Sequence, residues 1–333
     1  MKDAVNKRRF LWGLLIFVFF LSFAIGRYPV PIGTLIKVLL SKVFPIDKTW
    51  ADTIDTIVFR VRLPRILAAM LVGGSLSLSG AVYQGMFKNP LVSPDILGVS
   101  AGAAFGAALA IFLSFNTVGI QISAFLFGIL GVALVYLISI KVKEDPLISL
   151  VIIGILVGSI FTSLTSIIKY IADTEDKLPT ITFWLMGSLS GILPKDVKRV
   201  FVPISVGIVP LYLLRWKLNV LSLDEDEAKT LGLDTGRIRM IVVICSTLMT
   251  AASVSISGII GWIGLVIPHL GRILVGPDYR ILVPTTLLLG STYLLIIDNI
   301  ARAVTTVEIP LGILTSLIGA PFFIFLLLNK VRS

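Results

Sequence analysis

Four arginines of this chain stand where they could bind anionic groups. Arg60, Arg62 and Arg65 lie within six residues of one another, directly before a long apolar stretch, and Arg302 follows another apolar stretch. A guanidinium group pairs with carboxylates and phosphates through parallel hydrogen bonds. Two interpretations fit this pattern: docking of acidic residues on a partner protein, and contact with lipid headgroups.

The polar segment 215–237 carries the signals of a short helix. Ser222 through Glu225 form a capping box, which satisfies free amide groups of a first helical turn, and Gly232 supplies a stop. Three apolar side chains of this helix, Leu223, Ala228 and Leu231, could lie in a groove of a partner protein. A solvated connector helix is the alternative.

A third feature is the sequence from Asn89 to Pro94, which contains Pro90 and Pro94. Proline fixes φ and lacks a backbone donor, so these residues predict a stiff turn after the apolar stretch that precedes them. Such a turn could narrow a pathway through the molecule, or it could simply end a helix.

Composition indicates what surrounds these residues. Of 333 residues, 56% are hydrophobic and 14% are charged, and an ordinary soluble domain has about 25% charged residues. A chain of this size could not bury so many apolar side chains away from water, so lipid must surround much of it. The net charge of +10 is spread between apolar runs, which favours anionic lipid headgroups over nucleic acid as its partner.

The hydropathy pattern predicts an all-α, polytopic membrane helix bundle with about ten transmembrane helices, because each needs roughly 20 apolar residues. The expected spans are residues 10–26, 64–87, 96–115, 118–140, 147–170, 197–214, 238–257, 259–276, 281–300 and 310–329. An even number puts both termini on one side. Lysines and arginines in both tails predict that this side is cytoplasmic. We also expect a short surface helix within 27–63 and an apolar piece around Trp184.

Several kinds of chemistry lack their motifs. The sequence has no phosphate-binding G-x-x-x-x-G-K-[ST] loop, a single histidine (His269) and a single cysteine (Cys245), so we expect no ATPase, metal site, cofactor or catalytic residues in the chain itself. Acidic residues are nearly absent from the span interiors, and Asp298 and Glu308 lie near the ends of the last two. An ion-gradient-driven secondary transporter is therefore the weaker alternative, and we expect another protein to supply the energy.

Many short motifs occur in an order that resembles the FecCD family, the ABC importer permeases for iron-siderophore, haem and cobalamin. The resemblance covers about residues 55–328. It rests on Arg62-Leu63-Pro64-Arg65, Asn89-Pro90-Leu91, Leu97 to Gly102, Trp184 to Leu189, Asp226 to Gly232, Ser257-Gly258, Gly264 to His269, Asp298 to Arg302, Glu308 to Gly312 and Gly319-Ala320-Pro321.

The resemblance implies a type II ABC importer permease: one transmembrane domain over residues 1–333 that forms a homodimer in a bacterial or archaeal cytoplasmic membrane. It also implies two cytoplasmic ATPase subunits and an external substrate-binding protein that delivers a metal chelate. Oxyanions such as molybdate remain an open cargo.

Residue roles follow from the same resemblance. Arg62, Arg65 and Arg302 resemble the arginines that engage glutamates of the binding protein, and Asn89 and Leu91 resemble part of a cytoplasmic gate. Residues of the 215–237 loop resemble the helices that couple the permease to the ATPase: Leu223, Asp224, Glu225, Asp226, Glu227, Ala228, Leu231 and Gly232.

Overall fold

The computed structural model describes residues 2–26, 28–42, 44–142, 145–222, 230 and 234–331. Over these residues the chain is a bundle of helices without strands, as predicted. A helix occupies each of the ten expected spans. These helices are α1 (Lys2–Ala24), α4 (Leu63–Met86), α5 (Val99–Phe112), α6 (Thr117–Ser139), α7 (Pro146–Ile171), α9 (Pro194–Leu213), α12 (Thr235–Ser257), α13 (Ile263–Val275), α14 (Tyr279–Ala303) and α15 (Leu311–Val331).

Shorter helices connect them. They are α2 (Ile32–Leu40), α3 (Asp52–Asp55), the π-helical turn η1 (Thr56–Arg62), the 3-10 turn η2 (Pro94–Leu97), α8 (Lys177–Leu185), α10 (Arg215–Leu218) and the 3-10 turn η3 (Val220–Ser222). Helix α2 is the surface helix expected within 27–63, and α8 is the apolar piece around Trp184.

Two predicted spans are shorter than expected. Helices α5 and α13 have 14 and 13 residues, or about 20 Å each, against a hydrocarbon core of about 30 Å. The sequence before each helix leaves helical geometry: Gly98 adopts φ 78° before α5, and Trp262 adopts φ 70° before α13. Among the described residues, five helices are both long and apolar enough to cross a membrane unaided.

Polar caps set the starts of four long helices. The side chains of Asn116, Asp145, Asp234 and Asp278 accept hydrogen bonds from backbone amides in the first turns of α6, α7, α12 and α14. These amides have no partner within the helix, so a cap stabilises each start by about 1 kcal/mol.

Helix α4 forms the centre of the bundle and packs against α14, α12, α13 and α9. Gly73 and Gly290 let α4 and α14 meet backbone to backbone, because a Cβ atom on Gly73 would lie 2.2 Å from the carbonyl oxygen of Gly290. Together with α3 and η1, α4 runs as one helix of 35 residues from Asp52 to Met86. The π-helical turn lies just before Pro64, whose ring nitrogen cannot donate a helical hydrogen bond.

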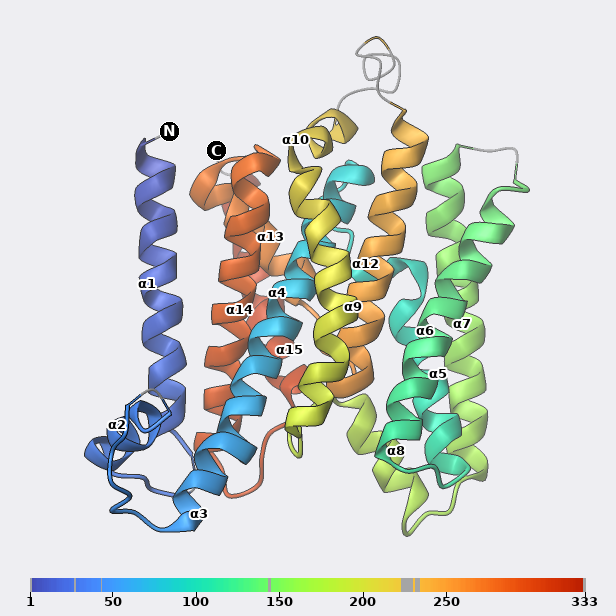
Figure 1. Cartoon of the computed structure of the whole chain (residues 1–333). Coiled ribbons are helices and arrows are strands. Elements are labelled where there is room, and N and C mark those ends of the chain that lie inside the picture. The colour runs from blue at the N-terminus through green and yellow to red at the C-terminus, as the bar shows by residue number, and fades with distance from the viewer. Residues whose placement is uncertain are drawn as a thin grey trace.

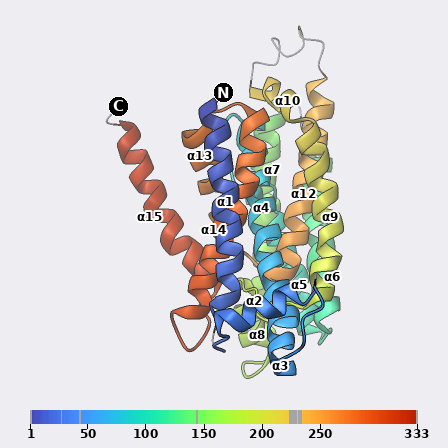
Figure 2. The same ribbon diagram turned by 60° about the vertical axis from the view of Figure 1, so that its left-hand side comes forward.

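Both termini lie at the same end of the bundle as α10 (Figure 1). We call this the terminal end. The opposite end, which carries α2, α3 and α8, is the distal end. Helix α15 leaves the rest of the bundle as it approaches the C-terminus (Figure 2).

Large apolar side chains are exposed along the outside of the long helices. Ile16 of α1, Leu126 of α6, Ile160 of α7 and Val202 of α9 are each more than half exposed. A water-soluble protein would bury such surfaces, so their distribution fits the lipid environment expected from composition.

Candidate functional site

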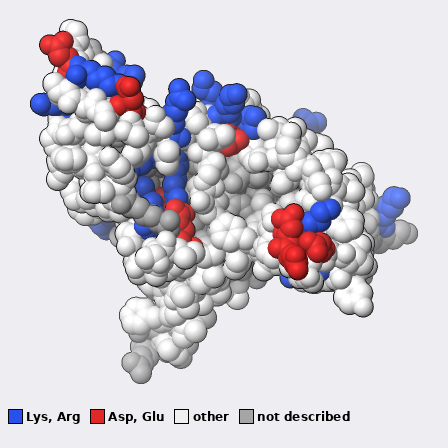
Figure 3. Space-filling view, turned by 90° about the horizontal axis from the view of Figure 1, so that it is seen from below, with Lys and Arg blue, Asp and Glu red and all other residues white. Residues whose placement is uncertain are grey.

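The three predicted docking arginines meet at the distal end, but they lie beneath its surface. Arg62, Arg65 and Arg302 are only 4%, 8% and 6% exposed, whereas Arg60 is exposed. Each buried guanidinium is engaged by groups of the chain itself. In Figure 3, which looks onto this end, basic and acidic side chains lie together in a hollow of the face.

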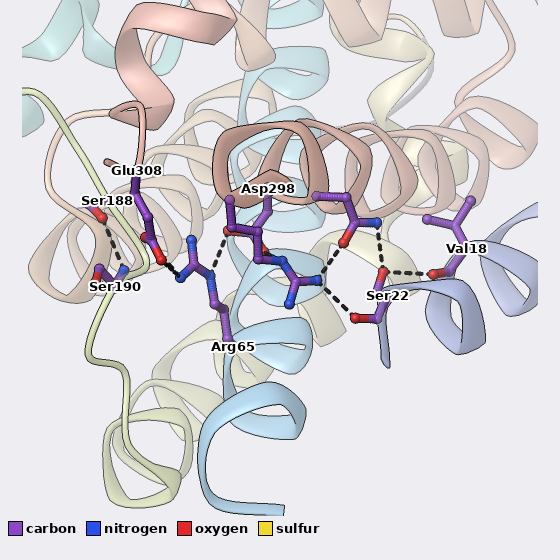
Figure 4. A network of polar contacts seen from close by, with 9 residues as sticks. Val18, Ser22, Arg65, Ser188, Ser190, Asp298 and Glu308 are labelled. Carbon is purple, nitrogen blue, oxygen red and sulfur yellow. Dashed lines mark hydrogen bonds and ion pairs between the residues drawn. The ribbon is translucent and has the colours of Figure 1, made fainter. Parts of the chain in front are cut away.

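Arg65 is held by two carboxylates (Figure 4). Its Nε donates to Asp298 Oδ1 at 2.9 Å, and its Nη1 donates to both carboxylate oxygens of Glu308, also at 2.9 Å. Asp298 is fully buried, while the Glu308 side chain keeps 21% exposure. Charge-assisted bonds of this length are the stronger kind, because both partners carry full charges.

Arg302 extends the network toward α1. Its Nε lies 3.4 Å from Asp298 Oδ2, and its Nη2 donates to the backbone oxygen of Ser22 at 3.0 Å and to the side-chain oxygen of Asn299. The Asn299 amide in turn donates to Ser22 Oγ at 2.8 Å, and Ser22 Oγ donates to the oxygen of Val18 at 2.7 Å (Figure 4). The network therefore joins α1, α4 and α14 at one level.

Arg62 has a different environment. Its guanidinium donates to the backbone oxygens of Phe23 and Tyr28, and Gly26 packs against it so closely that a Cβ atom there would lie 2.8 Å from Nη2. No acidic side chain of the described residues forms an ion pair with Arg62. The three guanidinium groups and two carboxylates of this cluster thus leave one positive charge without an anionic partner.

Local structure explains how the cluster assembles. Arg65 lies in the first turn of α4, and Asp298 and Arg302 are four residues apart on one face of α14. Glu308 lies in the non-helical connection between α14 and α15. Sequence analysis placed Asp298 and Glu308 near span ends but did not predict that they bind Arg65. Ser22 was missed, because it carries no charge that would have marked it, and Asn299 was noted only as part of the Asp298 to Arg302 motif, without a role.

Three segments at helix ends, residues 186–188, 257–258 and 311–312, are joined next to this cluster by backbone hydrogen bonds. These bonds run from Ser188 N to Ser257 O (2.7 Å), from Leu311 N to Gly187 O (2.8 Å) and from Gly312 N to Met186 O (3.1 Å). A Cβ atom on Gly187, Gly258 or Gly312 would lie 2.2–2.5 Å from a carbonyl oxygen of a neighbouring segment. Only glycine allows backbones to approach this closely, which gives a physical role to three glycines of the sequence motifs.

The predicted gate residues lie in the turn after α4, at the terminal end. Asn89 Oδ1 accepts a hydrogen bond from Leu91 N at 2.9 Å, and both residues are exposed. This Asx turn confirms the stiff turn expected from the two prolines. Their assignment to a gate remains a prediction.

Gln84 anchors this turn to the bundle. Its Nε2 lies 3.2 Å from Val92 O and 3.3 Å from the backbone oxygens of Gly264 and Leu265, and its Oε1 accepts from Arg272. Gln84 is 4% exposed. One amide thereby joins the last turn of α4, the loop that follows it and α13.

Asp278 at the start of α14 is a charged group outside the spans at the terminal end. It accepts from Asn219 Nδ2 at 2.8 Å and pairs with Arg280 at 3.0 Å. Burial acts to raise the pKa of Asp278, but the hydrogen bonds from Arg280 and Asn219 outweigh it and hold that pKa below its ordinary value.

The predicted coupling residues, Leu223 to Ala228, Leu231 and Gly232, lie outside the described residues. The flanking segments, η3 on one side and the start of α12 on the other, lie at the terminal end beside α10 (Figure 1). The loop therefore starts and ends at the same end as both termini.

Comparison with known proteins gives consistent matches along nearly the whole chain. The model of the FecCD transport family matches residues 14–329, a longer range than the motifs alone indicated. The chain is 46% identical over 311 residues to the molybdate import system permease protein MolB of Haemophilus influenzae, which covers 93% of this chain and 91% of that protein. It is 40% identical to a probable iron chelatin transport system permease protein of Helicobacter pylori, with 83% of each chain covered.

A solved structure has the same fold. It is described as a metal-chelate type ABC transporter in an inward-facing conformation, and it matches with a TM-score of 0.88 and 43% identity over 97% of this chain and 99% of that one. These relatives are ABC permeases, which favours the main interpretation over the ion-gradient alternative. The chain belongs to the FecCD transport family and is a multi-pass permease subunit of the ABC importer type.

Proposed function

We propose that two copies of this chain enclose a central pathway through which a metal chelate is imported, driven by ATP hydrolysis in two separate cytoplasmic subunits. The observation that carries the proposal is similarity over more than four-fifths of the chain to permeases whose names give iron chelatin, cobalamin and hemin as cargo. In this arrangement the terminal end is cytoplasmic and the distal end is external.

The exposed face of α7 supports a pathway between two copies. Ser159, Thr162, Ser163 and Ser166 are exposed at i, i+3, i+4 and i+7 positions of this spanning helix. A row of hydroxyl groups suits a wet pathway better than lipid, and it lies among exposed apolar residues that could contact a second copy.

We call Arg62, Arg65, Arg302, Asp298 and Glu308 the distal cluster. This cluster is proposed to dock an external substrate-binding protein. Its unmatched positive charge would attract carboxylates of that protein, with Arg62, Arg65 and Arg302 as the groups that receive them. Asn89 and Leu91 are proposed as part of the cytoplasmic gate, and residues 223–232 as the contact that transmits ATPase motion.

The first experiment is reconstitution. The chain is co-expressed with candidate ATPase and binding-protein genes, and ATP hydrolysis is measured in nanodiscs. Hydrolysis should rise when binding protein and cargo are added, and deletion of residues 223–229 should abolish transport driven by ATP. Transport that still follows ATP consumption after this deletion contradicts the coupling assignment.

Docking is tested by binding measurements. Arg65→Gln and Arg302→Gln should each weaken the affinity of the binding protein, while Lys198→Gln, an exposed cation of the same end, should leave it unchanged. Equal affinities for all three variants would remove the docking assignment.

A compact oxyanion is the second candidate cargo, because the molybdate permease of Haemophilus influenzae is 46% identical to this chain. Elemental analysis of the purified binding protein separates the two classes. Iron or cobalt at about one atom per protein supports a chelate, and molybdenum supports the oxyanion.

A further inference from the structure

Arg65 has two carboxylate partners that differ in how firmly they are held. Asp298 lies within α14, has no exposed surface and stands between two guanidinium groups, those of Arg65 and Arg302. Loss of Asp298 would leave the buried Arg302 without its carboxylate partner and would remove one of the two carboxylates that bind Arg65. Asp298 is therefore a fixed part of the fold.

Glu308 is the replaceable partner. It lies in the non-helical 304–310 connection and its side chain is one-fifth exposed. Among the described residues, Arg65 is the group that hydrogen bonds and pairs with it. When Glu308 moves away, Arg65 keeps its ion pair with Asp298, so the cost of the exchange is limited.

The charge of the cluster favours such an exchange. Arg62 is buried but held by backbone oxygens, so the cluster keeps one positive charge beyond those matched by Asp298 and Glu308. A carboxylate from outside would meet a guanidinium whose outward side is already shaped for two oxygens, because Glu308 places both of its oxygens 2.9 Å from Nη1.

We propose that Glu308 is an internal stand-in for a carboxylate of the external binding protein. It occupies the outward side of the Arg65 guanidinium in the free permease and gives way when the partner docks. The inference rests on the proposed docking role of this cluster. Its consequence is that Glu308 lowers the affinity of the partner, because the partner's carboxylate must compete with it.

The first test needs no partner. The permease in nanodiscs is treated with phenylglyoxal, which modifies accessible arginines, and the modification rate of each arginine is followed by mass spectrometry. In Glu308→Gln, Arg65 should react several-fold faster than in the wild type, and Glu308→Asp should give an intermediate rate. Arg60, which is exposed and is not a partner of Glu308, serves as the internal reference. An unchanged rate at Arg65 overturns the inference.

The second test measures affinity for the binding protein that stimulates ATP hydrolysis in the reconstituted complex. Glu308→Gln should lower Kd at least threefold, while Glu175→Gln, which removes an exposed carboxylate from the loop before α8, should not lower it. A purely structural role for Glu308 predicts the opposite, a weaker complex. That result, or an unchanged Kd, overturns the inference.

Failure of the docking proposal is recognised separately. If Arg65→Gln binds the partner as tightly as the wild type, the cluster is not the docking site and the stand-in role is overturned with it. If Arg65→Gln weakens binding but Glu308→Gln does not strengthen it, docking stands and only the competition by Glu308 is refuted.

Discussion

The two ends of the bundle are held together by different chemistry. At the distal end, Arg65, Asp298 and Arg302 form buried ion pairs, and the pair between Arg65 and Asp298 joins α4 to α14. At the terminal end, the two amide hydrogens of Gln84 are shared among three backbone oxygens, and its side-chain oxygen accepts from Arg272. Ion pairs accept exchange of one carboxylate for another, whereas a neutral amide that binds fixed carbonyl groups favours one arrangement. The comparison suggests that one carboxylate partner of Arg65 can be exchanged at the distal end, whereas Gln84 holds the turn at residues 89–94 to α13 in one arrangement.

The largest effect is expected at Asp298. Asp298→Asn keeps the shape of the side chain but removes the charge between two buried guanidinium groups, and we expect it to destabilise the protein by about 3–5 kcal/mol. The measurement is the unfolding midpoint in detergent. Asp173→Asn, on an exposed loop, is the control and should change little. Equal midpoints for the two variants would mean that the distal ion pairs contribute no more than a surface charge.

A smaller effect is expected at Gln84. Gln84→Leu preserves bulk but leaves Arg272 without this acceptor and three carbonyl groups without this donor, at a cost of about 2–3 kcal/mol. Amide hydrogen exchange should become faster in the loop 88–97, because Gln84 connects it to α13. If exchange there stays as slow as in the wild type, another contact holds the turn.

The close backbone contact at Gly187, Gly258 and Gly312, which we call the glycine junction, offers a paired test. Gly187 and Gly191 have nearly the same φ, 74° and 77°, but a Cβ atom would lie 2.3 Å from Ile259 O at Gly187 and would meet nothing within 4 Å at Gly191. Gly191→Ala should cost about 1 kcal/mol from backbone strain alone. Gly187→Ala should cost at least about 1 kcal/mol more, because the junction must open. Equal losses in thermal stability would show that close packing at the junction is unimportant.

The smallest effect is expected at Asp278. Asp278→Asn keeps a helix cap but loses the charge that pairs with Arg280, so we expect a loss of a few tenths of a kcal/mol at pH 7. Because the folded-state pKa is lowered, this contribution is present above the ordinary aspartate value of about 4 and is lost as pH falls through the folded-state pKa. Unfolding midpoints of both proteins between pH 7 and about pH 3 should therefore converge. A constant difference over that range would assign the effect to the cap.

The sequence predicted the helices better than the contacts between them. Runs of apolar residues sufficed to place ten helices, because lipid permits few alternatives to a helix. The same runs overestimated the lengths of α5 and α13, because Gly98 and Trp262 leave helical geometry inside apolar sequence. Apolar residues alone do not reveal where the backbone turns.

For the candidate site, the arginines were predicted but their surroundings were not. Three cations near span ends indicate binding of anions, yet the sequence does not tell whether those anions belong to a partner or to the chain. Glu308 is 243 residues from Arg65, and only the fold brings the two together. Their pairing depends on the packing of α4 against α14, which Gly73 and Gly290 permit.

The unbroken helix from Asp52 to Met86 has a mechanical consequence. At 1.5 Å per residue its 35 residues extend about 52 Å, well beyond the hydrocarbon core. It carries Gln84 near its C-terminal end and Arg65 four residues from its midpoint. If it tilts as a rigid lever about its midpoint, a rotation of about 5° moves each end by about 2 Å, in opposite directions. A displacement of the helix at Arg65 would then be transmitted to the turn at residues 89–94 without any change within the helix itself.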